Sequence, residues 1–312
     1  MKSKRFRRFY AAALLSSSSV FAGLLAGADA LDEQLKSHRT GDALSCSSCH
    51  AETRVVTGGT AGLGDRRADP FFVSAVIDQV SEASILALAD PADADANGIS
   101  GRAAWVWSLR DRRPAVGRFG WKATVGTLED QIANALATDM GLANALLDYA
   151  DATCFPDEPG CLIARRSAGS SNLLPRLSHA VRTSKPSDSP PNGSIYRAGL
   201  ALLAQVGCTA CHQPVLADPV GQPLVLFSDL LLHDLGPDLS EAQRVGSAGL
   251  SEWRTAPLLG LSQRSAFLHD GRAETITDAV TAHGGEATES KNLFLALSDA
   301  DSLELIEFLL SL

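Results

Sequence analysis

Apolar residues recur with helical spacing in several segments of this 312-residue chain. Residues 195–206 show this spacing and predict a helix. A second helix is expected at the end of the chain behind Ser298, a residue type that commonly caps helices. Its apolar positions are Leu303, Ile306, Phe308, Leu309 and Leu310. Gly199 would let the two predicted helices cross closely, because glycine has no Cβ atom.

The middle of the chain contains signals for a further helix and for a linker. Thr127 and Asp130 have the spacing of a capping box and predict a helix from there to about Met140. Alternation typical of strands is scarce, so the predicted class is all-α with long loops. The Ser-, Pro-, Asn- and Gly-rich residues 184–194 indicate a linker.

The chain begins like an exported protein. Five basic residues within the first eight precede an apolar, serine-rich stretch that closes with Ala28-Asp29-Ala30. This order predicts a signal peptide, residues 1–30, cleaved after Ala30. The alternative is a retained membrane anchor, but Ser16 to Ser19 interrupt the stretch and it is short for a membrane span. We therefore expect a periplasmic protein without a membrane span in the mature chain.

The length of the chain limits the number of domains, and its net charge limits the kinds of binding partner. Cleavage would remove five basic residues and one acidic residue, so the formal net charge would move from -9 to -13. A mature chain of 282 residues favours two domains over one. An acidic balance argues against binding to nucleic acid. It favours a basic partner, such as a small cytochrome or copper protein that donates electrons, or a protein substrate.

The cysteines carry the sharpest chemical signal. The chain contains Cys46-Ser-Ser-Cys49-His50 and Cys208-Thr-Ala-Cys211-His212, and each has the C-x-x-C-H pattern of haem attachment. Two thiols can bond to the two vinyl groups on one edge of a porphyrin, while the next side chain binds the iron. A zinc site and a redox dithiol also use C-x-x-C. Two complete motifs in an exported chain favour two covalently bound haems c.

The two motifs suggest how the chain is divided. We expect an N-terminal haem domain at residues 31–183, the linker at 184–194 and a C-terminal cytochrome c-like domain at 195–312. In the last domain, the predicted pair of crossing helices is typical of cytochromes c. The remaining cysteines, Cys154 and Cys161, lie in a Pro- and acid-rich loop. In an exported protein a structural disulfide is the first reading, and a reactive pair is the alternative.

The supply of iron ligands can be assessed from the residues alone. The chain has seven histidines, and those outside the two motifs are His38, His179, His233, His269 and His283. None lies between His50 and His179, and Met140 is the only methionine of the mature chain. An open sixth position at the first haem is therefore expected, as peroxide binding requires. His38 could instead close it from the N-terminal arm.

One loop is a candidate calcium site. Asp93, Asp95 and Asn97 alternate before a turn glycine, as at the start of a calcium loop. The bidentate glutamate that closes such loops is missing, and a solvated turn explains the residues equally well.

Across nearly all of the mature chain, a set of motifs resembles the di-haem oxidoreductases related to bacterial di-haem cytochrome c peroxidases and MauG-type enzymes. The resemblance implies two cytochrome c-like domains, with a haem that reacts with hydrogen peroxide in the first and an electron-supplying haem in the second. The motifs are Gly117-Arg-Phe-Gly-Trp121-Lys122-Ala, Gln131, Asp139-Met140-Gly141, Ser228-Asp-Leu-Leu-Leu-His233-Asp-Leu-Gly236, Glu252-Trp-Arg254-Thr-Ala-Pro257, Phe267-Leu-His269-Asp270-Gly271-Arg272-Ala and Ala282-His283-Gly284-Gly285-Glu286-Ala287.

The resemblance also implies roles for single residues. Trp121 corresponds to a tryptophan between the haems, and Gln131 to a glutamine that lines the peroxide pocket. Asp139 stands where those enzymes usually have a glutamate that assists proton transfer; the shorter acid departs from their pattern, and a charge at a helix end is the alternative reading. His283 matches the position of a methionine or tyrosine ligand, which places it opposite His212.

Two histidine ligands would lower the reduction potential of the second haem relative to His/Met ligation. His233 and His269 are expected to pack or to contact haem propionates. Two functional hypotheses remain open at this stage, a peroxidase-like enzyme and an electron carrier with two six-coordinate irons. The open first haem, Gln131 and Asp139 favour the enzyme.

A third hypothesis, thiol oxidation, depends on the family resemblance and on Cys154 and Cys161. Replacing both residues by serine tests it, with folding followed by circular dichroism and turnover by an activity assay. Because we expect a structural role, the variant should retain its catalytic activity wherever it folds. Loss of activity in a folded variant would support a reactive pair.

Overall fold

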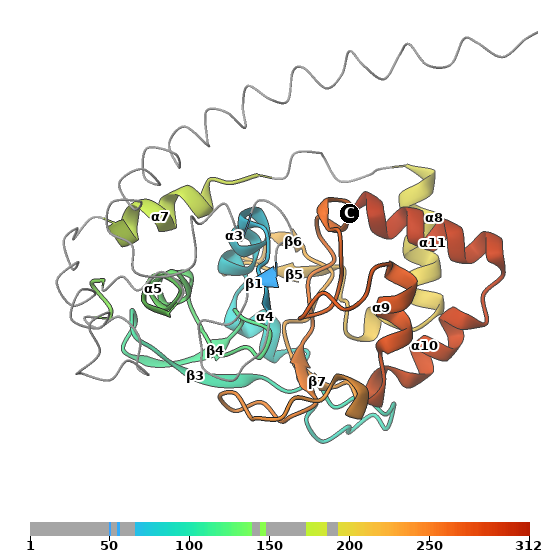
Figure 1. Cartoon of the computed structure of the whole chain (residues 1–312), viewed down its shortest axis with the longest axis horizontal. Coiled ribbons are helices and arrows are strands. Elements are labelled where there is room, and N and C mark those ends of the chain that lie inside the picture. The colour runs from blue at the N-terminus through green and yellow to red at the C-terminus, as the bar shows by residue number, and fades with distance from the viewer. Residues whose placement is uncertain (1–49, 51–54, 57–65, 139–143, 148–172, 186–192) are drawn as a thin grey trace, which may run out of the picture.

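The computed structural model describes residues 50, 55–56, 66–138, 144–147, 173–185 and 193–312 (Figure 1). Several predictions concern residues outside this set. These residues are the predicted signal peptide, His38, Cys46, Cys49, Asp139, Met140, Cys154 and Cys161.

Two crossing helices form the frame of the C-terminal half. Helix α8 (Ser194–Gln205) packs against α11 (Asp299–Ser311), as Figure 1 shows in yellow and red. A Cβ atom on Gly199 would lie 2.2 Å from the Cβ atom of Phe308, so the helices approach closely at the glycine. The Ser298 side chain accepts a hydrogen bond from the Asp301 amide at 3.2 Å and caps α11. Both sequence predictions for this helix pair are confirmed.

Shorter elements connect these two helices. Helix α9 (Ile276–Ala282) starts with a reciprocal capping box between Thr275 and Asp278, and α10 (Thr288–Leu295) follows it. Single 3₁₀ turns lie at η1 (Cys208–Ala210), η2 (Pro237–Leu239), η3 (Leu261–Gln263) and η4 (Gly285–Ala287).

The N-terminal half contains α3 (Phe71–Gln79), α4 (Glu82–Leu86), α5 (Leu128–Thr138) and α7 (Leu173–Arg182), and α7 packs on α3 and α5. The predicted cap of α5 is correct in one direction, because the Asp130 amide donates to the Thr127 hydroxyl at 3.2 Å. The Asp130 carboxylate does not bond back to Thr127. It accepts from the amides of Leu109 and Arg110 and so holds a hairpin turn against the helix.

The prediction of an all-α class holds only in part. Helices predominate, but the described residues also form four two-stranded antiparallel sheets. The pairs are β1 (Val55–Val56) with β2 (Arg66–Arg67), β3 (Ala104–Ser108) with β4 (Arg113–Gly117), β5 (Val215–Ala217) with β6 (Pro223–Val225), and β7 (Leu232–Asp234) with β8 (Glu252–Arg254). Most of these strands have two or three residues, too few for an alternating pattern to be recognised in the sequence.

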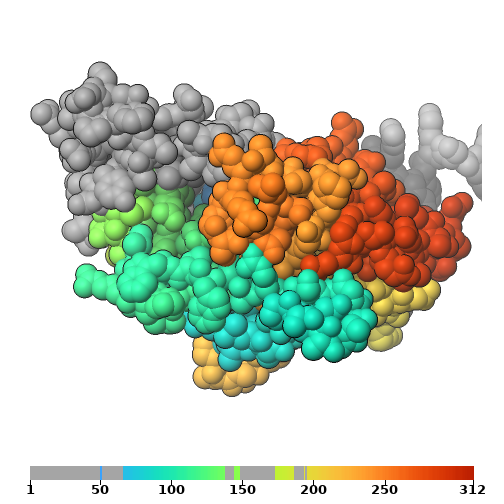
Figure 2. Space-filling view, turned by 90° about the horizontal axis from the view of Figure 1, so that it is seen from below, coloured from blue at the N-terminus to red at the C-terminus, as the bar shows by residue number. Residues whose placement is uncertain are grey.

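The two halves of the chain share one hydrophobic core. Its largest cluster joins Ile77 of α3 with Leu203 of α8 and Phe308 of α11. Arg102 pairs with Leu232 in an isolated β-bridge, and its guanidinium binds the Glu252 carboxylate. Arg102 also donates to the Ser247 carbonyl at 2.8 Å. Figure 2 shows turquoise and orange segments from the two halves of the chain side by side on the surface. Among the described residues, no helix has both the length and the apolar character needed to cross a bilayer.

The close crossing of α8 and α11 leads to a stability prediction. Replacing Gly199 by alanine should raise helix propensity, yet lower the free energy of unfolding by about 1–3 kcal/mol, because the new Cβ atom would overlap Phe308. Urea denaturation of the holoprotein would measure the change. A suitable control is Ala201→Ser, at an exposed position of the same helix. Equal stability of Gly199→Ala and the parent protein would show that the helices can separate without cost.

Candidate haem-binding site

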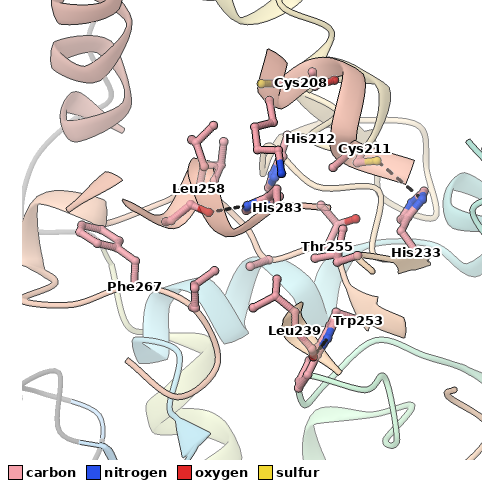
Figure 3. A pocket seen from close by; sticks show the side chains of 18 of the residues that line it. Cys208, Cys211, His212, His233, Leu239, Trp253, Thr255, Leu258, Phe267 and His283 are labelled. Carbon is pink, nitrogen blue, oxygen red and sulfur yellow. Dashed lines mark hydrogen bonds between the residues drawn. The ribbon is translucent and has the colours of Figure 1, made fainter. Parts of the chain in front are cut away.

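The second cysteine motif forms a tight turn at the end of α8. Gly207 adopts a left-handed conformation with φ of 77°, which ends the helix, and the 3₁₀ turn η1 follows at Cys208. The His212 amide donates to the Cys208 carbonyl at 2.9 Å and closes this turn. Both thiols and the imidazole therefore border one cavity (Figure 3).

This cavity has a volume of about 190 Å³, and its lining is mostly apolar. His283 reaches it from the end of α9, and Figure 3 shows its imidazole next to that of His212. The structure thus brings the two cysteines and both predicted iron ligands of the second haem to one cavity.

The two imidazoles are held in the same tautomer. Nδ1 of His212 donates to the Phe227 carbonyl at 3.0 Å, and Nδ1 of His283 donates to the Ala279 carbonyl at 2.6 Å. A carbonyl can only accept, so the hydrogen resides on Nδ1 in both rings. Nε2 keeps its lone pair, which is the arrangement of histidines that bind metals.

Burial keeps both rings neutral. It lowers the pKa of His212 to about 4, with a further contribution from the nearby His283. Burial also lowers the pKa of His283. At neutral pH each ring can therefore donate an electron pair to iron, because no proton competes for Nε2.

The two thiols are poorly suited to a dithiol or a zinc site. Burial raises the pKa of Cys208 to about 11 and also raises the pKa of Cys211. Thiols that are protonated at neutral pH are weak nucleophiles and weak metal ligands. Cys211, Asp229 and His233 do lie within reach of a common ion. However, His233 donates from Nε2 to Asp229 at 2.9 Å and from Nδ1 to Glu286 at 2.8 Å, so neither nitrogen is free to bind a metal.

His233 is instead a buried imidazolium beside the thiol. Burial opposes its charge, but hydrogen bonds with Asp229, Cys211 and Glu286 outweigh burial and raise the pKa of His233 to about 12. Glu286 also accepts from the amide and hydroxyl of Ser100, in the other half of the chain. The turn after His283 is thereby held in place from both halves.

The cavity wall also contains an unpaired donor that suits a haem. Nε of Arg264 is buried without a hydrogen-bond partner, and the side chain is 7% exposed. A buried N–H group without an acceptor is costly, so an anionic acceptor is expected there. A haem carries two propionates on the edge opposite its thioether bonds. The residues present therefore fit a haem c.

Of the first motif, the structure describes only His50. Its Nδ1 donates to the Asp69 carbonyl at 2.7 Å, and its ring stacks on Phe71 with centroids 4.4 Å apart. Burial lowers the pKa of His50. His50 is thus neutral with Nε2 available, like the two histidines of the second site.

Aromatic rings line the side of the cavity that faces the N-terminal half. Trp121 donates from Nε1 to the Arg67 carbonyl at 2.7 Å and lies edge-on to His269, with centroids 6.3 Å apart. His269 stacks on Trp253 at 3.9 Å. The ammonium of Lys122 lies 3.5 Å from the centroid of the Trp253 ring. Trp121 therefore adjoins the second site, while its hydrogen bond ties it to the strand that leads to Asp69.

The other predicted site residues lie elsewhere. Gln131 is half-buried on α5 and is not part of this cavity. In the candidate calcium loop, carboxylate oxygens of Asp90, Asp93 and Asp95 lie within 4.8 Å of one another. Asp93 accepts hydrogen bonds from the amides of Asn97 and Gly98. These contacts suit a solvated turn as well as a cation site.

Four residues of the site carried no role in the sequence interpretation. Arg254 and Glu286 stood within recognised motifs, but nothing in those motifs indicated their contacts. Asp69 and Arg264 gave no signal. Their importance follows from pairing over 185 and 195 residues of sequence separation, which a linear pattern does not reveal.

Three solved structures are similar to this chain. A MauG-like protein associated with microbial copper homeostasis is 18% identical with a TM-score of 0.50, over 90% of this chain and 87% of that one, which supports the fold alone. The diheme peroxidase BthA from Burkholderia thailandensis E264 is 17% identical with a TM-score of 0.46, over 90% and 85%. Hydrazine synthase from Kuenenia stuttgartiensis is 22% identical with a TM-score of 0.34; the match covers 49% of this chain and 59% of that chain.

No curated protein matches the sequence. The family described as "Di-haem oxidoreductase, putative peroxidase" matches residues 39–158 and 184–312, which together are most of the chain. Both C-x-x-C-H motifs and His283 fall within these ranges. The chain therefore belongs to the di-haem oxidoreductase family, and haem is its cofactor.

Proposed function

We propose that the protein is a periplasmic peroxidase that reduces hydrogen peroxide to water with two electrons and two protons per molecule. In this proposal Cys46, Cys49 and His50 hold the first haem, and Cys208 and Cys211 hold the second between His212 and His283. When bound, the first haem supplies an iron that can accept peroxide and the second supplies electrons. The cavity that gathers both cysteines and two neutral histidines is the observation that carries the proposal.

The proposed roles of the two haems depend on the axial ligands of each iron. His212 and His283 both offer Nε2 to one cavity, which supports a second haem with both axial positions filled. For the first haem, the structure describes His50, while His38 lies outside the described residues. We propose that this iron is open to peroxide because the sequence has no histidine between His50 and His179.

Trp121 is the proposed relay between the sites. It borders the cavity of the second haem, and its Nε1 hydrogen bond reaches Arg67, two residues before the Asp69 carbonyl that holds His50. Gln131 and Asp139 are proposed for the peroxide pocket. In these roles Gln131 would orient the peroxide, and the Asp139 carboxylate would deliver a proton to the departing oxygen.

The proposed electron donor is a basic protein. Helix α11 exposes Asp299, Glu304 and Glu307, and the described part of that helix contains no basic residue. Leu309 of the same helix lines the cavity. An acidic surface one helix away from the second haem would steer a basic cytochrome or copper protein toward it.

We further propose that the mature chain consists of haem domains at residues 31–183 and 195–312, and that calcium binds at Asp93, Asp95 and Asn97.

The reaction with peroxide tests the central claim. The oxidised holoprotein should show one high-spin and one low-spin ferric haem by paramagnetic resonance, and one equivalent of hydrogen peroxide should remove the high-spin signal. Asp139→Asn should slow this step by roughly 10²–10⁴-fold, the usual contribution of a general acid. Asp299→Asn, at an exposed position, serves as the control. Two low-spin haems that do not respond to peroxide would identify an electron carrier, with His38 as the first candidate for the extra ligand.

Ligation by His283 can be tested by potentiometry. Replacing His283 by methionine should raise the reduction potential of the second haem, because thioether ligation stabilises the ferrous state relative to a second imidazole. His179→Met, on the exposed face of α7, should leave both potentials unchanged. An unaltered potential in a His283→Met holoprotein would mean that His283 does not bind the iron.

A further inference from the structure

Residues 66–69 contact both proposed haem sites. The Arg67 amide donates to the His269 carbonyl at 2.8 Å, and the Arg67 carbonyl accepts from Trp121. Two residues later, the Asp69 carbonyl accepts from Nδ1 of His50 at 2.7 Å. One short segment therefore holds the aromatic wall of the second site and the proposed iron ligand of the first.

The Asp69 side chain extends these contacts to the cavity. One carboxylate oxygen lies 3.2 Å from a guanidinium nitrogen of Arg254, and the other lies 3.2 Å from a guanidinium nitrogen of Arg264. Both arginines line the cavity of the second site. Arg254 also donates from Nε to the Gly120 carbonyl at 2.8 Å, so its hydrogen bonds face the protein. Arg264 keeps Nε unpaired for an anion in the cavity.

The electrostatics of this cluster favour a bound propionate. The Asp69 carboxylate lies 3.2 Å from each of two guanidinium groups, those of Arg254 and Arg264. One negative charge therefore stands between two positive ones. The surplus positive charge can be balanced by a haem propionate at the free Nε. The stability of each buried charge in this cluster depends on its partners, because removing one charge leaves another buried without an opposite charge.

We propose that Asp69 is a positioning residue that couples the two haem sites. Its backbone carbonyl orients His50, while its carboxylate orients Arg264 toward a propionate of the second haem. A change of charge at the second haem alters the pull of the propionate on Arg264, and the Asp69 backbone transmits that change to His50. This inference rests on the placement of the two haems in the proposed function, and it requires no reaction with peroxide.

Two variants test the cluster, and each removes one of its opposite charges. Asp69→Asn removes the negative charge and keeps the size of the side chain. Arg264→Gln removes the positive charge and leaves the peptide that holds His50 untouched. The matched control is Asp78→Asn, because Asp78 also pairs with an arginine, Arg182, at 2.7 Å and is similarly shielded, with 13% of its side chain exposed against 16% for Asp69.

The first measurement is the reduction potential of the second haem in each holoprotein. Reduction adds one negative charge, so Asp69→Asn should raise the potential and Arg264→Gln should lower it. A tenfold change in the one-electron equilibrium constant, about 59 mV, is the scale expected for each. Asp78→Asn should leave the potential unchanged.

The second measurement separates coupling from a general effect of charge. In the half-reduced parent protein, the paramagnetic resonance signal of the first ferric haem should shift when the second haem is reduced. Both cluster variants should lose this shift, although they move the potential in opposite directions, and Asp78→Asn should retain it. If Asp69→Asn does not assemble with haem, Arg264→Gln provides the same test without altering residue 69.

Three results would overturn the inference. They are a parent protein in which the first haem does not respond to reduction of the second, cluster variants that keep the full response, and an equal loss in Asp78→Asn. Because no peroxide is added, failure of the peroxidase proposal would appear separately, as an oxidised protein that does not react with peroxide while the response between the haems persists.

Discussion

Hydrogen bonds from imidazole Nδ1 to backbone carbonyls are the interaction on which the proposed chemistry depends. Such a bond fixes the tautomer of each ring, and burial removes the competing proton. The three acceptors come from different parts of the fold: Asp69, two residues before α3, supplies one, a loop at Phe227 another and α9 the third. Ring orientation is thus a property of the folded backbone, and cofactor attachment alone would leave the rings free to rotate.

The two halves of the chain are joined where the site requires rigidity. Glu286 connects the turn after His283 to Ser100, and Arg254 connects the cavity wall to Asp69. A contiguous hydrophobic core lies behind these contacts. Motion of one half relative to the other would therefore break buried charged contacts, whose loss is costly because few of these groups can reach water instead. This arrangement suits electron transfer, which requires stable distances between the sites.

The distribution of charge differs between the surface and the cavity. The whole chain is acidic, yet the cavity wall contains Arg254 and Arg264, and the imidazolium of His233 adjoins Cys211. Positive groups at a buried site offset the negative charge of propionates and favour a reduced iron. In the proposed function, two histidine ligands act in the opposite direction. The balance of these effects would set the potential of the second haem, and the negative exterior would affect mainly the approach of partners.

The sequence alone indicated the haem cofactor and three of the helices, α5, α8 and α11. C-x-x-C-H is a local constraint, since the two thiols and the imidazole must meet one porphyrin, and a local constraint is legible in a linear motif. The Ser298 cap was predictable for the same reason, because it depends on one residue and its neighbours. The crossing at Gly199 was expected from the helix pair that is typical of cytochromes c, and glycine permits it because it has no Cβ atom. The role of His283 came from family resemblance, and the cavity is consistent with it.

Only the tertiary structure decided how Asp69, Arg254 and Arg264 form one cluster, because their pairing spans more than half of the chain. The short strands and the bond from Asp130 to the hairpin turn were hidden for a similar reason. The short strands and this bond are stabilised by contacts between residues that are distant in sequence. The local sequence around each residue does not identify such partners.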